Sequence, residues 1–158
     1  MIVLAGCGSG GHKANATDVR TVVGRGYRFS APSSWSIQRT PHEVTALSGP
    51  VDLAGVTTFT LARAYRPSLW TKAVASLDRT ATTLAAQNGG EVRARDTVVV
   101  TGRRARRYEI AYRADGVAMV EQMAFVLAGR TEYQVLCRFK DGGDDGVCRT
   151  LFSSFRLG

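Results

Sequence analysis

Residues 107–128 read RYEIAYRADGVAMVEQMAFVLA, two strand-like runs on either side of an Asp-Gly pair at 115–116. Apolar side chains stand at every second position of the first run, which is typical of a strand with one buried face. An Asp-Gly pair between two such runs is a strong signal for a two-residue hairpin. A second turn at Gly129-Arg130 leads into a further strand that ends at Phe139. The stretch therefore predicts an antiparallel meander.

Residues 68–87 carry the periodicity of a long helix. Pro67 and Ser68 suit its start, and Asn88-Gly89-Gly90 suits its end. Residues 146–155 predict a short C-terminal helix, with Asp144 or Asp145 placed to cap it. The apolar stripe of the long helix comprises Trp70, Ala73, Val74, Leu77, Ala81, Leu84 and Ala85.

The fold class expected from these elements is α+β, an antiparallel sheet with the long helix and the short C-terminal helix packed on it. A chain of 158 residues with 44% hydrophobic residues fits one core. We place this single domain at residues 25–158. The remaining strands are expected at residues 27–30, 35–38, 43–47, 56–65 and 91–101.

The opening of this domain resembles the PsbP-like family. Gly26-Tyr27-Arg28-Phe29 is followed by Pro32 and Trp35, the aromatic strand, proline and tryptophan of that family. The mid-chain helix, the meander and a closing strand and helix ending in Ser153-Ser154-Phe155 occur in the same order. The family includes the photosystem II extrinsic subunit, a Ran-binding nuclear-transport factor and many bacterial lipoproteins. The resemblance implies an αβα sandwich that acts by docking onto larger partners, without a shared active site.

The first residues resemble a bacterial lipobox. Leu4-Ala5-Gly6-Cys7 has an aliphatic residue and two small residues before the cysteine, whose thiol would take the lipid. The Gly, Ser, Asn and Thr residues that follow suit a flexible tether, so we assign residues 1–24 to a truncated signal and tether. A signal peptide also needs a charged start and an apolar stretch of about 7–15 residues, so we expect the start to be misplaced or truncated. An ordinary terminus with a chance cysteine is the alternative.

If Cys7 carries lipid, two cysteines remain that could pair with each other, Cys137 and Cys148. A disulfide between them would join the last strand of the meander to the C-terminal helix and indicates an oxidising compartment. Two reduced, buried cysteines are the alternative. We predict no metal site, because no Cys-x-x-Cys occurs and the two histidines are His12 and His42.

Basic residues outnumber acidic ones by 21 to 13, which favours anionic partners. The densest cluster comprises Arg103, Arg104, Arg106 and Arg107, and on a strand Arg104 and Arg106 would share one face. We weigh a solvated hairpin end against a contact with anionic lipid or an acidic wall polymer. Nucleic acid is disfavoured, because interleaved aromatic residues are missing and export would separate the protein from it.

The residues argue against an enzyme. No Gly-x-Ser-x-Gly elbow is present, and Asp141, Asp144 and Asp145 lack the spacing of a calcium loop. We expect no cofactor. The favoured function is an exported accessory or binding protein, anchored by lipid to the outer face of the bacterial cell membrane, with an envelope protein as partner. The alternatives are a carrier with a cavity lined by Phe59, Trp70 and Tyr112, and a cytosolic interaction module.

Overall fold

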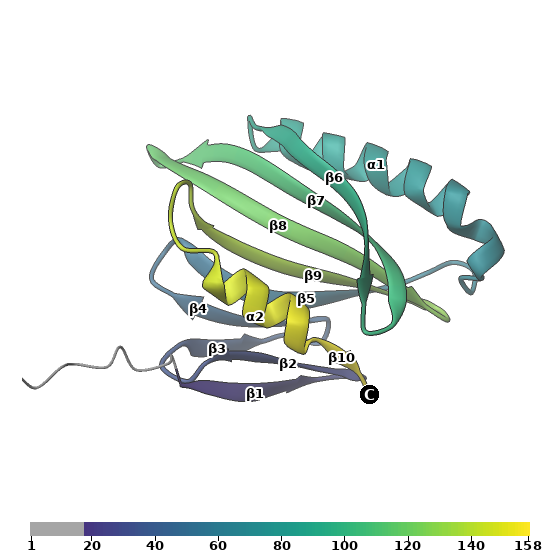
Figure 1. Ribbon diagram of the computed structural model, residues 1–158, viewed down its shortest axis with the longest axis horizontal. Helices are drawn as coiled ribbons and strands as arrows, with labels where there is room; N and C mark the ends of the chain where they lie inside the picture. Colours follow the sequence, from purple (N-terminus) through teal and green to yellow (C-terminus); the bar gives the residue numbers. More distant parts are fainter. Residues whose placement is uncertain (1–17) are drawn as a thin grey trace, which may run out of the picture.

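The computed structural model describes residues 18–158, and its centre is a seven-stranded antiparallel sheet (Figure 1). The strand order is β3-β4-β5-β9-β8-β7-β6, so the predicted meander is confirmed as β6 to β9. Asp115 and Gly116 both have positive φ, 51° and 78°, as the two-residue hairpin between β7 and β8 requires. The strands are β3 (Ser36–Arg39), β4 (Glu43–Ser48), β5 (Asp52–Thr60), β6 (Glu91–Val100), β7 (Arg103–Ala114), β8 (Val117–Ala128) and β9 (Thr131–Lys140).

A second sheet of three strands contains β1 (Val19–Gly24), β2 (Tyr27–Pro32) and β10 (Arg156–Leu157), in the order β1-β2-β10. The strand β1 corrects the expected domain boundary at residue 25. Val22 is buried, and β1 pairs with β2 along its full length, from Val19 opposite Pro32 to Gly24 opposite Tyr27. The folded domain therefore begins before Arg25, and residues 19–24 belong to this domain and not to the expected tether.

Helix α1 (Trp70–Gln87), preceded by a 3-10 turn η1 (Pro67–Leu69), covers strands β6 and β7 on one face of the large sheet. Leu77, Ala81 and Ala85 are its buried residues, as the apolar stripe predicts. The small side chains of Ala81 and Ala85 let the helix lie close to the sheet, where all three residues join a cluster with Tyr108, Ile110, Met123 and Phe125. No helix among residues 18–158 is long and apolar enough to span a membrane.

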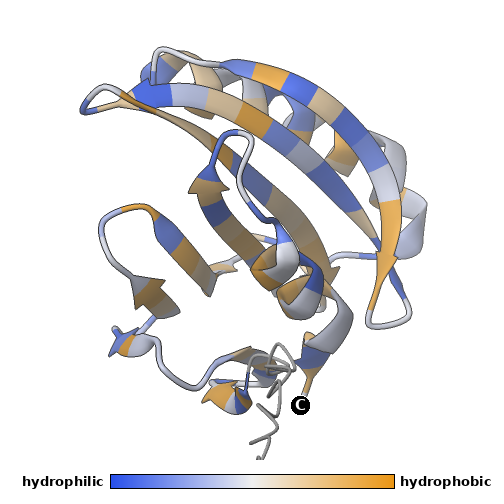
Figure 2. Ribbon diagram, turned by 60° about the vertical axis from the view of Figure 1, so that its left-hand side comes forward, coloured by the Kyte–Doolittle hydropathy of each residue, from blue (hydrophilic) through white to orange (hydrophobic). Residues whose placement is uncertain are grey.

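Helix α2 (Gly146–Ser154) lies on the opposite face, between β2 of the small sheet and β9 of the large one. Figure 2 shows the large sheet curving over this helix. Leu151 and Phe155 are fully buried there together with Phe29 and Val135. The arrangement of helix, sheet and helix is the predicted α+β fold, and residues 18–158 form one body around these two clusters.

Candidate docking surface

The predicted arginine cluster lies at the start of β7. Arg104 and Arg106 point to the face that carries α1, and Arg107 points to the other face, as the strand alternation predicts. Three of the four arginines contact side chains of their own chain. Arg103 makes no side-chain hydrogen bond or ion pair within residues 18–158.

Arg106 is held by Asp78 of α1. Its Nε donates to Oδ1 of Asp78 at 2.9 Å and its Nη2 donates to Oδ2 at 3.3 Å, while the hydroxyl of Tyr108 also donates to Oδ1 at 2.7 Å. Burial acts to raise the pKa of Asp78, but the hydrogen bonds from Arg106 and Tyr108 outweigh it and lower that pKa. Arg106 thus joins the helix to the sheet and is not a free cation.

Arg104 and Arg107 have partners as well. The guanidinium of Arg104 lies over the ring of Trp70, 5.2 Å from its centroid. Nη2 of Arg107 donates to Oδ2 of Asp96 at 2.8 Å across β6 and β7. The predicted contact of this cluster with an anionic surface stays a prediction, and its most available members are Arg103 and Arg104, both exposed.

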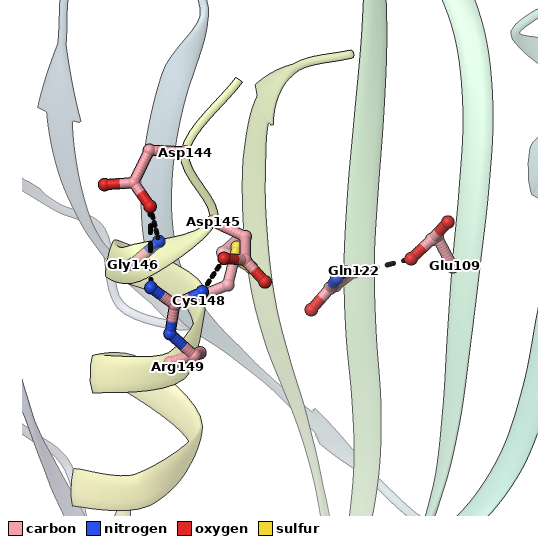
Figure 3. Close-up of a disulfide and its surroundings, with 8 residues drawn as sticks. Glu109, Gln122, Asp144, Asp145, Gly146, Cys148 and Arg149 are labelled. Atoms are coloured by element: carbon pink, nitrogen blue, oxygen red, sulfur yellow. Dashed lines mark hydrogen bonds and ion pairs between the residues drawn. A yellow bond between two sulfur atoms is a disulfide. The ribbon is translucent and has the colours of Figure 1, made fainter. Parts of the chain in front are cut away.

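The disulfide between Cys137 and Cys148 is present, with Cα atoms 5.4 Å apart. Figure 3 shows Cys148 in the first turn of α2, above Arg149 and close to Asp145. The N-cap of α2 is Asp145, whose side chain makes no capping hydrogen bond, whereas Asp144, one residue earlier, accepts a hydrogen bond from the backbone N–H of Gly146 at 2.9 Å. Both cysteines are buried, and their bond fixes α2 to the central strand β9.

The turns at one end of the molecule carry only positive charge. This arginine end consists of the turns at 25–26, 40–42, 61–66, 101–102 and 129–130, which lie toward the right in Figure 1. Its turns contribute four arginines and no acidic residue. None of the four forms an ion pair within residues 18–158, and all are exposed: Arg25, Arg63, Arg66 and Arg130.

The turns at the other end carry only negative charge. This aspartate end includes Asp18, where the described chain begins, and the turns at 33–35, 49–51, 88–90, 115–116 and 141–145. Asp115 lies in one turn, and three further aspartates lie in the loop between β9 and α2. Arg93 pairs with Asp141 at 2.9 Å, and Arg149 pairs with Asp144 and Asp145, so part of this charge is compensated.

A pocket of about 300 Å³ opens at the arginine end, between the β1–β2 turn and the ends of β5 and β9. We call it the arginine-end pocket. Its lining contains one arginine, one histidine, one tyrosine, three threonines and no carboxylate. The polar lining residues are Arg25, His42, Thr58, Thr60, Thr131 and Tyr133. Sequence reasoning missed this set, because its members come from four separate segments.

A larger hollow of about 460 Å³ lies at the aspartate end and includes Tyr112. The ion pair between Arg93 and Asp141 lies within it, so its charges are satisfied by the chain itself. The residues proposed for a carrier cavity are not brought together: Phe59 lines the arginine-end pocket, whereas Tyr112 lines this hollow and Trp70 contacts Arg104. Within residues 18–158 no three His, Cys, Asp or Glu side chains cluster as metal ligands would.

This architecture is the PsbP-like fold. The structure superposes on cyanobacterial PsbP (CyanoP) from Synechocystis sp. PCC 6803 with a TM-score of 0.67 and 13% identity, covering 98% of this chain and 99% of that one. A crystal structure from Bacteroides thetaiotaomicron VPI-5482 matches with a TM-score of 0.57 and 9% identity over 84% of this chain, which spans 45% of that protein. No family model and no curated protein matches the sequence. These similarities establish the fold only, so any function has to be inferred from the candidate site.

Proposed function

We propose that this protein is an exported lipoprotein, held by Cys7 at the outer face of a bacterial membrane, where it acts as a non-enzymatic accessory protein that docks onto an envelope partner. The observation that carries the proposal is the buried disulfide between Cys137 and Cys148. Structural disulfides persist in oxidising compartments and are rare in the cytosol. A cytosolic interaction module is disfavoured for the same reason.

The lipobox supports the same conclusion from the other end of the chain. Cys7 and the residues around it lie outside the described part of the structure, so the argument there rests on the sequence Leu4-Ala5-Gly6-Cys7. The Gly- and Ser-containing stretch after Cys7 then separates an anchor from the first strand, β1. A tethered domain of this kind can reach a partner without inserting into the membrane.

The distribution of side chains favours docking over catalysis. The most strongly hydrogen-bonded ionic group is Asp78 with Arg106 and Tyr108, and it joins α1 to the sheet. Asp78 lines no described pocket, and its carboxylate is not free to act as a base. Neither a cysteine nor a carboxylate lines the arginine-end pocket beside His42. A surface rich in unpaired arginine is instead suited to binding an anionic partner.

The test is the intact mass of the protein purified from the membranes of its own host, measured without reductant and again after reduction. We expect a mass above that of residues 7–158 by a diacylglyceryl or triacyl group, and a gain of two protons on reduction. Cys7→Ser is the control, and it should leave the folded domain soluble and unlipidated with the disulfide intact. An unmodified Cys7 in membrane-free fractions would contradict the anchor, and free thiols at Cys137 and Cys148 would contradict the compartment.

A further inference from the structure

The arginine-end pocket has the composition of a site for an oxyanion. Arg25 supplies a guanidinium, which can donate two parallel hydrogen bonds to a phosphate or carboxylate. The remaining polar lining consists of hydroxyls and the His42 imidazole, and no carboxylate is among the lining residues. Glu43 lies in an adjoining hollow that shares Arg25, His42 and Thr58 with this pocket, and that hollow also contains Arg39 as a second cation.

The backbone holds the polar groups of this pocket in place. Thr58 donates both its N–H, at 2.7 Å, and its hydroxyl, at 3.1 Å, to the carbonyl of His42, which fixes the 40–42 turn against β5. Thr60 and Thr131 face each other as a cross-strand pair of β5 and β9. Tyr133 is packed at its ring by Tyr27 and Phe155, with centroids 5.9 and 6.1 Å away.

Apart from Thr58, the polar side chains that line this pocket make no hydrogen bond within the described part of the chain. The hydroxyls of Thr60, Thr131 and Tyr133 make no hydrogen bond among residues 18–158, and the guanidinium of Arg25 makes no ion pair there. Protein hydroxyls that are neither paired nor buried are available to a ligand. The three hydroxyls and the Arg25 guanidinium are therefore available to a ligand.

The surroundings add a long-range attraction. The 61–66 segment is bonded to the β8–β9 turn, since Leu61 N–H donates to the carbonyl of Arg130 at 2.8 Å. Arg63, Arg66 and Arg130 thereby belong to segments that meet at the same end of the molecule as the pocket. Several cations without ion pairs at this end raise the local concentration of an anionic ligand, and more so for a ligand of many charges.

We propose that the arginine-end pocket binds a phosphate group presented by an anionic polymer outside the membrane. Phosphate fits the donors best, because it offers several acceptor oxygens to one guanidinium and the clustered hydroxyls. A polymer is chosen over the membrane surface because the described chain begins at the aspartate end, opposite the pocket. That choice of location rests on the proposed anchor at Cys7, whereas binding by the pocket does not.

The test uses the full chain with Cys7→Ser and three probes. Poly(glycerol phosphate) presents the phosphate as a polymer, vesicles of phosphatidylglycerol present the same chemistry as a membrane, and polyglutamate presents carboxylates. Calorimetric titration is expected to show binding of poly(glycerol phosphate), with vesicle cosedimentation no greater than for neutral vesicles and weaker binding of polyglutamate. Equal or preferred binding to the vesicles or to polyglutamate would overturn the proposal.

Matched variants separate the site from net charge. Arg25→Gln removes the guanidinium at the pocket and should weaken binding about tenfold, the loss expected for a charge-assisted hydrogen-bonding group. Tyr133→Phe removes one donor and should weaken binding less. Arg113→Gln makes the same charge change at the aspartate end and should leave the affinity within about twofold. Equal losses for Arg25→Gln and Arg113→Gln, or no binding to poly(glycerol phosphate) by a folded protein, would refute the site without bearing on lipidation.

Discussion

Asp78 of α1 accepts two hydrogen bonds from the guanidinium of Arg106 on β7, and this pair joins the long helix to the sheet. The side chains are 27% and 15% exposed, so water screens the pair less than it screens an ion pair at the surface. The Tyr108 hydroxyl, two residues further along β7, donates to the same carboxylate. The Asp78 carboxylate thus accepts from two partly buried donor side chains, Arg106 and Tyr108, which would otherwise lack this hydrogen-bond partner.

Asp78→Asn is expected to destabilise the domain by about 1–3 kcal/mol at pH 7, because it leaves Arg106 partly buried without its charge partner. Urea denaturation would measure the change in the free energy of unfolding. Asp96→Asn is the matched control, since its pair with Arg107 is 47% and 41% exposed and should contribute well under about 1 kcal/mol. Equal effects of the two substitutions would contradict a structural role for Asp78.

The same pair predicts a pH dependence. The pKa of Asp78 is lower in the folded protein than its ordinary value of 3.8, so the unfolded chain binds the proton more tightly. The stabilisation is therefore complete above about pH 5 and is lost as the pH falls through the folded pKa. In acid, the difference in unfolding free energy between the natural chain and Asp78→Asn should shrink toward zero.

Glu132 on β9 is expected to act in the opposite direction. Burial raises the pKa of its carboxyl, and no ion pair compensates it within residues 18–158. The folded protein therefore holds the proton more tightly than the unfolded chain, and stability is lost as the pH rises through the folded pKa. Glu132→Gln should raise the melting temperature at pH 7.

Below about pH 4 both states of the natural chain carry a neutral Glu132 side chain, so the gain from Glu132→Gln should disappear there. Glu91→Gln provides the comparison, because it removes the same charge from an exposed position on β6. If Glu91→Gln raises the melting temperature as much, the gain comes from net charge and burial of Glu132 is not its cause.

The local patterns of the sequence predicted the meander and both helices correctly. The alternation at Tyr108, Ile110 and Tyr112 marks the face under α1, and two of these side chains are buried there. The stretch at 19–24 resembles a tether in the sequence because it precedes the first recognisable aromatic strand. Its own alternation is short, with Val22 as its one buried residue, and it is strand only because β2 lies beside it.

The candidate site was much less predictable. Strand alternation correctly placed Arg104 and Arg106 on one face, but the contact with Asp78 depends on how α1 crosses the sheet, which is a tertiary property. Predicting the arginine end would have required knowledge of which turns lie at the same end of the molecule. Arg25 and Arg130 are far apart in the sequence, and the strand order brings their turns to the same end of the molecule.

The pairing of Cys137 with Cys148 offers the sharpest test of how the domain is held together. The two residues are 11 apart in the sequence, and their bond holds α2 against β9 between the two sheets. Cys137→Ala with Cys148→Ala should lower the free energy of unfolding by about 2–3 kcal/mol, chiefly because the unfolded chain is no longer constrained. Reduction of the natural chain should give a similar loss, and the double variant should then be insensitive to reductant. A natural chain as stable after verified reduction as before it would show that packing around Leu151 and Phe155, and not the covalent bond, secures the helix.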